Sequence, residues 1–425
     1  MAGGGFPLSL MINRKLLDFD FEKICSVTLS PLNCYACLTC GKYFQGRTEG
    51  TPAYQHALHH EHLVYLNLKT LKAYTLPDNL EYNDSGQLDD IRAVIRPKFD
   101  SALLKDIDER RSPLSDLQGR QFLPGFIGLN QIKANDYVNV ILQAFAHVRP
   151  LRDDFLLNFS GKQGGLGEAF KEVLEKIWNP TRFKTQTSPH ELLQAISTAS
   201  SKRFSLVKQS DPLDFMIFLL NTLTKECSIV NELFQGRIRI DSCDISQAKQ
   251  AIDGEMKVDF KPFYFLSLDL PSKPLFADPR NPTAIPQVNL TSLLEKFNGG
   301  NFTYKQTTAS AYSIQKYPKY LILHVNRFIK NNFVLEHNPT IVQFSPNSLT
   351  LPSQEMTDSP VYNLIANVYC SFPNDEDKNL KSFGVHVKCP ATDSWLEIEN
   401  LTVRETQAQM LFMSESYIQI WESAE

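Results

Sequence analysis

The sequence lacks long apolar runs, a strong excess of either charge and a paired arrangement for most of its cysteines. No stretch approaches the roughly 20 consecutive apolar residues that a membrane-spanning helix requires, and residues 1–15 do not have the layout of a signal peptide. Four cysteines are scattered singly along the chain: Cys227, Cys243, Cys370 and Cys389. Isolated cysteines are usual for reduced thiols and unusual for a disulfide framework. These absences predict an intracellular protein with no membrane partner.

The charges of the chain are nearly balanced. Lys and Arg together number 43 against 47 Asp and Glu, which gives a formal net charge of -4. Such a chain has no general electrostatic attraction to nucleic acid. We therefore expect any association with RNA to run mainly through protein partners.

The length and composition predict a soluble globular protein of two or more domains, because 425 residues exceed one ordinary hydrophobic core. We see no internal repeat and no low-complexity tract. The predicted organisation is a tail at 1–20, a small metal-centred domain at 21–100, a charged and partly helical linker at 101–120, and a larger domain at 121–425.

Residues 34–62 contain three of the chain's eight cysteines and four of its nine histidines. A CxxC turn lets two sulfurs bind one metal ion while two imidazoles complete a tetrahedral shell, which is the arrangement that zinc requires. We predict zinc as the cofactor, with these four ligands: Cys37, Cys40, His56 and His62.

The alternative is that the cysteines are small buried hydrophobic residues and the histidines form a solvated turn. The GKYF stretch after Cys40 favours zinc, because a tight turn usually follows a zinc knuckle. We expect His59 and His60 to be surface groups. Cys25 and Cys34 could bind a second ion only with partners that the sequence does not reveal.

The larger domain has helical periodicity in its first half and strand-like runs in its second half. The predicted helices lie at 138–145, 190–199 and 211–223, and the predicted strands within 260–271, 320–329, 362–372, 381–389 and 416–421. Helices followed by strands favour an α+β domain with a largely antiparallel sheet.

In order and spacing, the segments 128–145, 210–223, 262–271 and 317–328 and the C-terminal segment around Trp395 resemble the ubiquitin-specific protease fold. The resemblance covers roughly residues 121–423, and the N-terminal module resembles the ubiquitin-hydrolase-type zinc finger, with the four predicted ligands on ligand positions. It implies a small zinc finger followed by a papain-like fold with a helical thumb and an antiparallel-sheet palm and fingers.

The family's catalytic positions carry other residues in this chain. The family's nucleophile box, GLxNxGNTCYxN, places the cysteine position at Asp136 and the position of an oxyanion-holding Asn at Gln131. The histidine position, thirteen residues before Trp395, falls on Ser382, and the third position falls on Glu399. Since a cysteine protease needs a thiolate beside an imidazole, the resemblance implies that the chain has no catalytic residues and is not an enzyme.

Two residues near these positions need a structural interpretation. Asp136 directly precedes a predicted helix, so we expect it to be the N-cap. His386 is expected on the same strand face as Ser382 but about 13 Å along it, too far to replace the missing base. The fingers of the family often carry a second zinc ribbon, but here only Cys227 and Cys243 are available, so we do not expect one.

One branch of the family is similar in idiosyncratic stretches as well as in the shared boxes. The segments 17–47, 66–79, 132–139, 178–184 and 416–421 resemble the inactive, ubiquitin-specific-protease-like splicing factors. This resemblance implies a nuclear, non-catalytic protein-binding scaffold that helps assemble or stabilise the U4/U6.U5 tri-snRNP. The implied partners are tri-snRNP proteins, namely the large scaffold protein, the RNA helicase and the GTPase of the U5 particle.

Two other functions remain open from the sequence. The zinc finger could bind free ubiquitin, with Tyr35, Tyr43 and Arg47 as the available pieces of a cleft, although such tyrosines more often pack a small core. The chain could also be a thiol hydrolase that uses Cys370 or Cys389, although thiols on strands are usually buried and inert.

Overall fold

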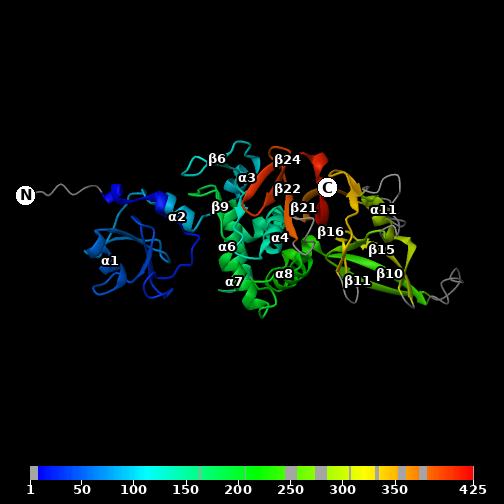
Figure 1. The fold of residues 1–425 in the computed structure, drawn as a ribbon, viewed down its shortest axis with the longest axis horizontal. Coiled ribbons are helices and arrows are strands. Elements are labelled where there is room, and N and C mark those ends of the chain that lie inside the picture. The colour runs from blue at the N-terminus through cyan, green and yellow to red at the C-terminus, as the bar shows by residue number, and fades with distance from the viewer. Residues whose placement is uncertain are drawn as a thin grey trace, which may run out of the picture. The chain divides into compact units, whose positions relative to one another are not determined.

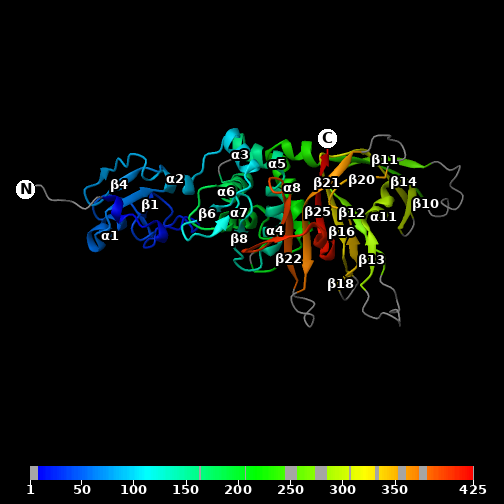
Figure 2. The same ribbon diagram turned by 90° about the horizontal axis from the view of Figure 1, so that it is seen from above.

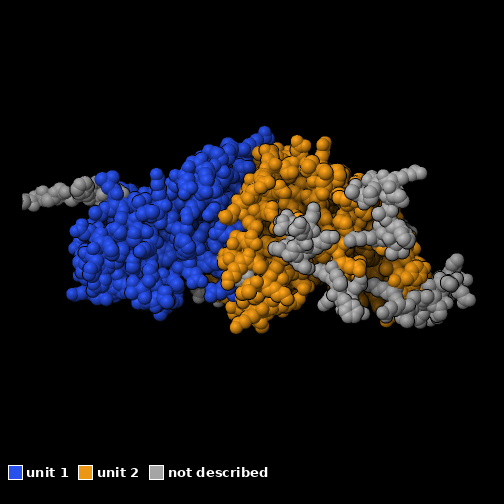
Figure 3. Space-filling model, in the orientation of Figure 1, with its two compact units in different colours: residues 1–130, 169–195 blue, residues 131–168, 196–425 orange. Residues whose placement is uncertain are grey.

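The computed structural model describes residues 8–161, 164–205, 207–244, 256–272, 285–305, 308–330, 335–352, 360–372 and 381–424. Contacts divide the chain into two compact units, one of Met1–Asn130 with Ala169–Ala195 and one of Gln131–Glu168 with Ile196–Glu425 (Figure 3). Among the described residues, no helix has the length and apolar character needed to cross a membrane. The predicted domain boundaries, including the linker at 101–120, stay a prediction.

A five-stranded antiparallel sheet forms the first part of unit 1, in the order β2-β1-β3-β4-β5 (Figure 1). Its strands are β1 (Cys34–Cys37), β2 (Tyr43–Gln45), β3 (Val64–Asn67), β4 (Ala73–Thr75) and β5 (Leu80–Glu81). Its helices are η1 (Leu8–Met11), η2 (Arg14–Leu16), α1 (Pro52–His60) and α2 (Asp89–Ile95). Side chains alternate across a strand, so Cys34 and Ala36 of β1 join one apolar cluster while Tyr35 and Cys37 join another on the opposite face.

The rest of unit 1 contains short strands and parts of two longer helices. Its elements are α3 (Ser101–Glu109), β6 (Leu114–Ser115), β7 (Gln121–Phe122), β8 (Gly128–Leu129), β9 (Gln186–Thr187), α6 (Leu166–Trp178) and α7 (His190–Ala199), the last two of which also reach into unit 2. Helix α3 begins where Asp100 accepts a 2.8 Å hydrogen bond from the backbone N–H of Leu103, which is an N-cap. It buries Leu104 and Ile107.

Unit 2 has a helical part built around α4 (Asp136–Ala146). The other helices are α5 (Arg149–Leu157), α8 (Pro212–Glu226), α9 (Ile229–Phe234), α11 (Leu290–Leu294), η3 (Glu295–Phe297) and η4 (Ala408–Met413). Every residue of α4 is buried, because the helix packs against α5 and α8 and also against strands of the large sheet (Figure 2). A helix that is buried all round is a core element, and this one carries Asp136 at its first position.

The large sheet of unit 2 has eight strands, with β12-β16-β25-β21-β22-β23-β24 in order and β20 paired to β21. These strands are β12 (Leu266–Asp269), β16 (Tyr320–Asn326), β20 (Leu349–Thr350), β21 (Val361–Ser371), β22 (Ser382–Cys389), β23 (Ser394–Glu399), β24 (Thr402–Thr406) and β25 (Glu415–Ala424). All neighbours are antiparallel except β12 and β16, which are parallel. The predicted α+β class with a largely antiparallel sheet is confirmed.

A separate four-stranded antiparallel sheet has the order β11-β10-β15-β14. Its strands are β10 (Gly236–Asp244), β11 (Lys257–Phe263), β14 (Asn298–Lys305) and β15 (Thr308–Lys316). Two small pairs complete the unit: β13 (Gln287–Asn289) with β19 (Ile341–Gln343), and β17 (Phe328–Lys330) with β18 (Leu335–His337). Ile238 and Ile314, which face each other in this sheet, pack into the same apolar cluster as strands of the large sheet.

Candidate metal site and the catalytic positions

The predicted metal ligands come from a strand end, a turn, a helix and the loop after that helix, all in unit 1. Cys37 ends β1, Cys40 lies in the turn that follows, His56 is on α1 and His62 follows that helix. The turn closes through a 2.9 Å hydrogen bond from the N–H of Gly41 to the carbonyl of Cys37. Gly41 has φ +77, and a Cβ on it would lie 2.2 Å from the carbonyl oxygen of Leu16, so this turn requires glycine.

The four side chains place their ligand atoms within 4.8 Å of one another. The Sγ of Cys37 lies 3.5 Å from Nδ1 of His62, and the Sγ of Cys40 lies 3.4 Å from Nε2 of His56. The two imidazole nitrogens are 3.0 Å apart. A tetrahedron with zinc–sulfur and zinc–nitrogen bonds of ordinary length has edges of about 3.3–3.8 Å. The two sulfur–nitrogen distances lie in this range and the nitrogen–nitrogen distance is shorter, so the donor set fits a zinc ion in type and number.

The neighbouring histidines and cysteines have other contacts. His59 is exposed and its Nδ1 donates a 2.7 Å hydrogen bond to the carbonyl of Gln55. The Sγ of Cys25 accepts hydrogen bonds from the N–H groups of Val27 and Thr28, and the thiol of Cys34 donates to the carbonyl of Ser30. Within the described ranges, the four predicted ligands form the single metal-type cluster of His, Cys, Asp and Glu side chains.

Asp136, at the position assigned to the family's nucleophile, is buried in unit 2. Its side chain accepts a 2.6 Å hydrogen bond from Nε2 of Gln209, which also donates a 2.9 Å bond to the carbonyl of Lys381. Burial raises the pKa of this carboxyl above its ordinary value, while the bond from Gln209 acts in the opposite direction. The expectation that Asp136 is the N-cap is wrong: α4 begins at Asp136 and the N-cap position is Asn135.

Asn135 uses its side chain to shape the loop before the helix. Its Oδ1 accepts hydrogen bonds from the N–H groups of Ile132 and Lys133, and its Nδ2 donates a 3.0 Å bond to Asn139. Periodicity marks the helix but does not decide between two adjacent polar residues for its cap, because both Asn and Asp are good caps.

The other catalytic positions lie close to this carboxyl. Ser382 is the first residue of β22, next to Lys381, and its hydroxyl donates a 3.1 Å hydrogen bond to Glu399. Gln131 accepts a 2.9 Å bond from the side chain of Asn400, the neighbour of Glu399. The structure therefore brings the sequence-assigned positions together, with Gln209 as a linking residue that no sequence signal indicated.

The remaining candidate groups for catalysis are enclosed elsewhere in the sheet. The ring of His386 stacks on Tyr369 with centroids 4.6 Å apart and lies 3.3 Å from the side-chain amide of Asn367. Burial lowers the pKa of His386 to about 4. Burial also raises the pKa of Cys370 to about 12, so this thiol is not a thiolate at neutral pH, and Cys389 is buried too.

The candidate pieces of a ubiquitin cleft have divided roles. Tyr35 and Tyr43 are both buried, and the hydroxyl of Tyr43 donates a 2.6 Å hydrogen bond to the carbonyl of Asp18. Arg47 is the accessible member: its guanidinium lies 4.2 Å from the ring centroid of Tyr74 and donates a 2.7 Å bond to Asn79. The two tyrosines thus belong to the small core, as such residues usually do.

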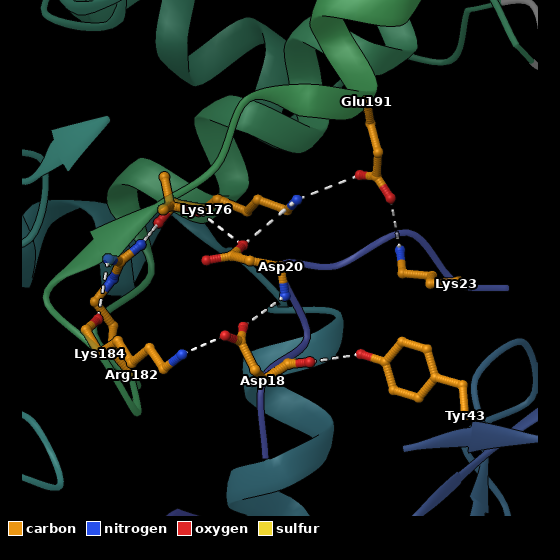
Figure 4. Close-up of polar contacts among 9 residues, drawn as sticks. Asp18, Asp20, Lys23, Tyr43, Lys176, Arg182, Lys184 and Glu191 are labelled. Atoms are coloured by element: carbon orange, nitrogen blue, oxygen red, sulfur yellow. Dashed lines mark hydrogen bonds and ion pairs between the residues drawn. The ribbon is translucent and has the colours of Figure 1, made fainter. Parts of the chain in front are cut away.

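A polar cluster in unit 1 joins the segment 17–23 to the region of α6, β9 and α7 (Figure 4). Asp18 pairs with Lys184, and the hydroxyl of Thr187 donates a 2.9 Å hydrogen bond to Asp20. The ammonium of Lys176 lies 3.6 Å from Asp20 and 3.3 Å from Glu191, while that of Lys23 lies 3.5 Å from Glu191 (Figure 4). No local sequence pattern predicts these pairs, because their members are far apart along the chain.

Comparison with known proteins agrees with this architecture. Residues 127–421 match the family model described as ubiquitin carboxyl-terminal hydrolase, and residues 25–87 match the model of a Zn-finger in ubiquitin-hydrolases. The chain is 41% identical to ubiquitin carboxyl-terminal hydrolase 39 of Mus musculus over 448 residues, covering 96% of this chain and 78% of the relative.

Two further similarities are to yeast proteins. The chain is 32% identical to pre-mRNA-splicing factor SAD1 of Saccharomyces cerevisiae, covering 97% of this chain and 92% of the relative. The crystal structure of an essential yeast splicing factor superposes with a TM-score of 0.83 at 32% identity, covering 99% of this chain and 100% of that one. The chain belongs to the ubiquitin carboxyl-terminal hydrolase family and carries, before the family's fold, the zinc finger found in ubiquitin hydrolases.

Proposed function

We propose that this protein is a nuclear pre-mRNA splicing factor, a non-catalytic scaffold that helps assemble or stabilise the U4/U6.U5 tri-snRNP. The relatives named as splicing factors support the role, since they align over nearly the whole chain and not over a single domain. The partners we propose are tri-snRNP proteins: the large scaffold protein, the RNA helicase and the GTPase of the U5 particle.

One observation supports the absence of catalysis most directly. The first position of α4 carries the buried carboxyl of Asp136, hydrogen-bonded to Gln209, where the family's fold presents its nucleophile. A carboxylate is a poor nucleophile toward an isopeptide, and the hydroxyl of Ser382 cannot act as a general base near neutral pH. We propose that the helical part and the sheets are kept as a rigid platform for protein partners.

We also propose that the cofactor is one structural zinc ion, held by the four clustered side chains: Cys37, Cys40, His56 and His62. All four tetrahedral positions would be filled by protein atoms, which is typical of a structural site, whereas a catalytic zinc keeps a position open. The ion would stabilise a small sheet whose own core is thin.

The test is a tagged pull-down from nuclear extract, with and without ribonuclease, that identifies the co-purifying proteins and small nuclear RNAs. Recovery of tri-snRNP proteins that survive ribonuclease supports the scaffold. In parallel, purified chain is incubated with a ubiquitin isopeptide substrate beside an active family member. Cleavage that survives metal chelation and disappears in Asp136→Ala would refute the non-catalytic role.

A second candidate function, binding of free ubiquitin, is favoured by the accessible pair of Arg47 and Tyr74 on the zinc-finger sheet. Titration of the chain with ubiquitin, compared between wild type and Arg47→Ala, tests it. Lys105→Ala on α3 is a matched control that also removes an exposed cation. Absence of saturable binding up to about millimolar ubiquitin discards this candidate.

A further inference from the structure

A groove of about 530 Å³ lies in unit 1 at the end of the zinc-finger sheet where β1 begins and β3 ends. Its walls are the loop 31–34 on one side and the turn 67–70 on the other, with Lys23 and Arg96 beside them. The turn is held by Asn67, whose side-chain oxygen accepts hydrogen bonds from the N–H groups of Lys69 and Thr70. The sheet backbone closes the floor, where the N–H of Leu68 donates to the carbonyl of Cys34.

The charged lining of the groove has one sign. Lys23, Lys69 and Arg96 line it, and no carboxylate does. Lys23 is half-buried and its ammonium is 3.5 Å from Glu191, so this carboxylate partly neutralises its charge (Figure 4). Lys69 and Arg96 are exposed, and among the described residues neither takes part in an ion pair of 4.0 Å or less. Arg96 also donates a 3.5 Å hydrogen bond to the carbonyl of Lys69 and lies within electrostatic range of Glu175. Two exposed cations without a close ion pair favour a ligand that carries carboxylates.

The uncharged lining is mixed: it includes the polar side chains of Asn33, Asn67 and Thr70 as well as apolar ones. Leu68 is buried at the floor and Leu32 is 70% exposed at the rim. The same loop exposes 66% of Val27 and 71% of Leu29 just before Pro31. Single exposed apolar residues are ordinary, whereas this loop exposes three large ones within residues 27–32.

Leu29 has a second unfavourable feature, a φ of +56. The left-handed conformation is unfavourable for leucine, and here the side chain that adopts it is exposed to water. Neither cost is recovered by burial within the fold. The turn itself is held by backbone hydrogen bonds from Leu29 to Cys25 and from Cys25 to Ser30, so a partner that covers the loop would offset the exposure of the side chain.

We propose that this groove binds a short acidic segment of a partner protein, with an apolar side chain over Leu32 and Leu68 and carboxylates against Lys69 and Arg96. Single-stranded RNA fits the lining less well, because bases are held by stacking on aromatic side chains and no aromatic residue lines the groove. The proposal rests on the scaffold role, because it names the chemistry of one of that scaffold's contacts.

The test uses the purified full chain and fluorescence anisotropy of two labelled peptides, one an Asp-Glu-Leu repeat and one a matched Asn-Gln-Leu repeat. The acidic peptide is expected to bind saturably, and the neutral one at least about tenfold more weakly. The double variant Lys69→Glu with Arg96→Glu should weaken the acidic peptide by about tenfold or more, and Leu32→Asp should also weaken it. Lys105→Glu, on the exposed face of α3, should leave it unchanged.

All the substituted groove residues are exposed, so the variants should unfold at the wild-type temperature, which is checked alongside. The proposal is overturned by absence of saturable peptide binding up to about millimolar concentration. It is also overturned if the groove substitutions leave the affinity for the acidic peptide unchanged. A third contrary result is a uridine oligonucleotide that binds these residues when the peptide does not. If the nuclear pull-down recovered no tri-snRNP proteins but the acidic peptide still bound, the scaffold role would be rejected and the peptide-binding groove would be supported.

Discussion

Asp18 pairs with Lys184, 166 residues further along the chain, while the carbonyl of the same aspartate accepts a hydrogen bond from Tyr43 (Figure 4). Tyr43 belongs to β2 of the zinc-finger sheet, and Lys184 precedes β9. The next residues reinforce the link, since the rings of Phe19 and Phe183 lie 6.5 Å apart. The segment 17–23 therefore connects two parts of unit 1. Its backbone bonds to the zinc-finger sheet, and its charged side chains pair with the region around β9.

This relationship predicts a measurable coupling between Asp18 and Lys184. The two side chains are 22% and 33% exposed, so the pair is screened less than a surface pair. In a double-mutant cycle with Asp18→Asn and Lys184→Met, we expect a coupling of about 0.5–1.5 kcal/mol, measured by hydrogen exchange of unit 1. The control cycle is Lys105 with Glu109, an exposed pair at 3.9 Å, for which we expect no resolvable coupling. Equal coupling in both cycles would contradict the prediction.

The metal cluster predicts about one zinc ion per chain by elemental analysis. Cys40→Ser should abolish stoichiometric zinc and destabilise unit 1 by several kcal/mol, because binding energy at a structural zinc site is folding energy. The control is His59→Ala, which removes an exposed imidazole from the same helix and should retain the ion. Stoichiometric zinc in Cys40→Ser, or none in the wild type, would show that these side chains do not hold the metal.

The buried carboxyl of Asp136 predicts a stability change with a defined pH dependence. Its pKa is raised in the folded chain by burial, so the folded chain holds this proton more tightly than the unfolded chain. The resulting penalty is absent below the ordinary carboxyl pKa of about 3.8 and grows as the pH rises through it. Asp136→Asn keeps an oxygen for Gln209 and removes the charge. We expect its melting temperature to exceed the wild type by a few degrees at pH 7.5, with the gap closing near pH 4.

The control for this prediction is Asp393→Asn, because Asp393 is 89% exposed and its pKa is lowered by the neighbouring Lys388. This change should lower the melting temperature slightly or leave it unchanged. If Asp136→Asn instead destabilised the chain at all pH values, the helix N-terminus would be stabilising the charge more than burial penalises it.

The sequence was sufficient to predict the helices and strands whose pattern is carried by neighbouring residues. The run at 138–145 predicted α4, and the runs rich in β-branched and aromatic residues predicted β16, β21, β22 and β25. The resemblance to the ubiquitin-specific protease boxes placed Asp136, Ser382 and Glu399 at positions that share one neighbourhood in that family's fold. Such predictions work because helix periodicity and motif spacing are carried by consecutive residues.

Long-range polar partners could not be predicted. Gln209 links Asp136 to Lys381 across separations of 73 and 172 residues, and neither an amide nor a lysine carries a local signal for such a contact. The pairing of β12 with β16 in parallel was missed for a related reason: alternation predicts a strand but not the direction of its neighbour.

The last prediction concerns Glu172 of α6 and Glu191 of α7, two half-buried carboxyls that are hydrogen-bonded to each other. Burial and the charge of Glu191 raise the pKa of Glu172 to about 7. Although burial opposes it, Lys176 and Lys23 lower the pKa of Glu191 to about 2. The opposite directions of the two shifts indicate that the pair holds one proton in common in the folded chain.

The sign of the pH dependence follows from these two shifts. The contribution of Glu172 is fully present below its ordinary pKa of about 4.5 and is lost as the pH rises toward 7, whereas that of Glu191 is lost only as the pH falls toward 2. Burial lowers the pKa of nearby His190, so this group makes the folded chain more stable as the pH rises toward about 6.5. Above that pH it no longer opposes the loss of stability from Glu172. Wild-type unit 1 should therefore lose stability from about pH 4.5 to about pH 7, and the last part of this loss, above pH 6.5, is free of the His190 titration.

Glu172→Gln keeps the shape and removes this titration, so its stability should be flatter over the same range. The difference in pH response between the two proteins should be on the order of 1 kcal/mol, because partial exposure reduces the effect of a shift of this size. It is measured by hydrogen exchange of α6 and α7 at pH 6.5 and pH 8 after correction for intrinsic exchange rates. Glu109→Gln on the exposed face of α3 is the matched control. Parallel pH responses in wild type and Glu172→Gln would mean that the two carboxyls do not share a proton.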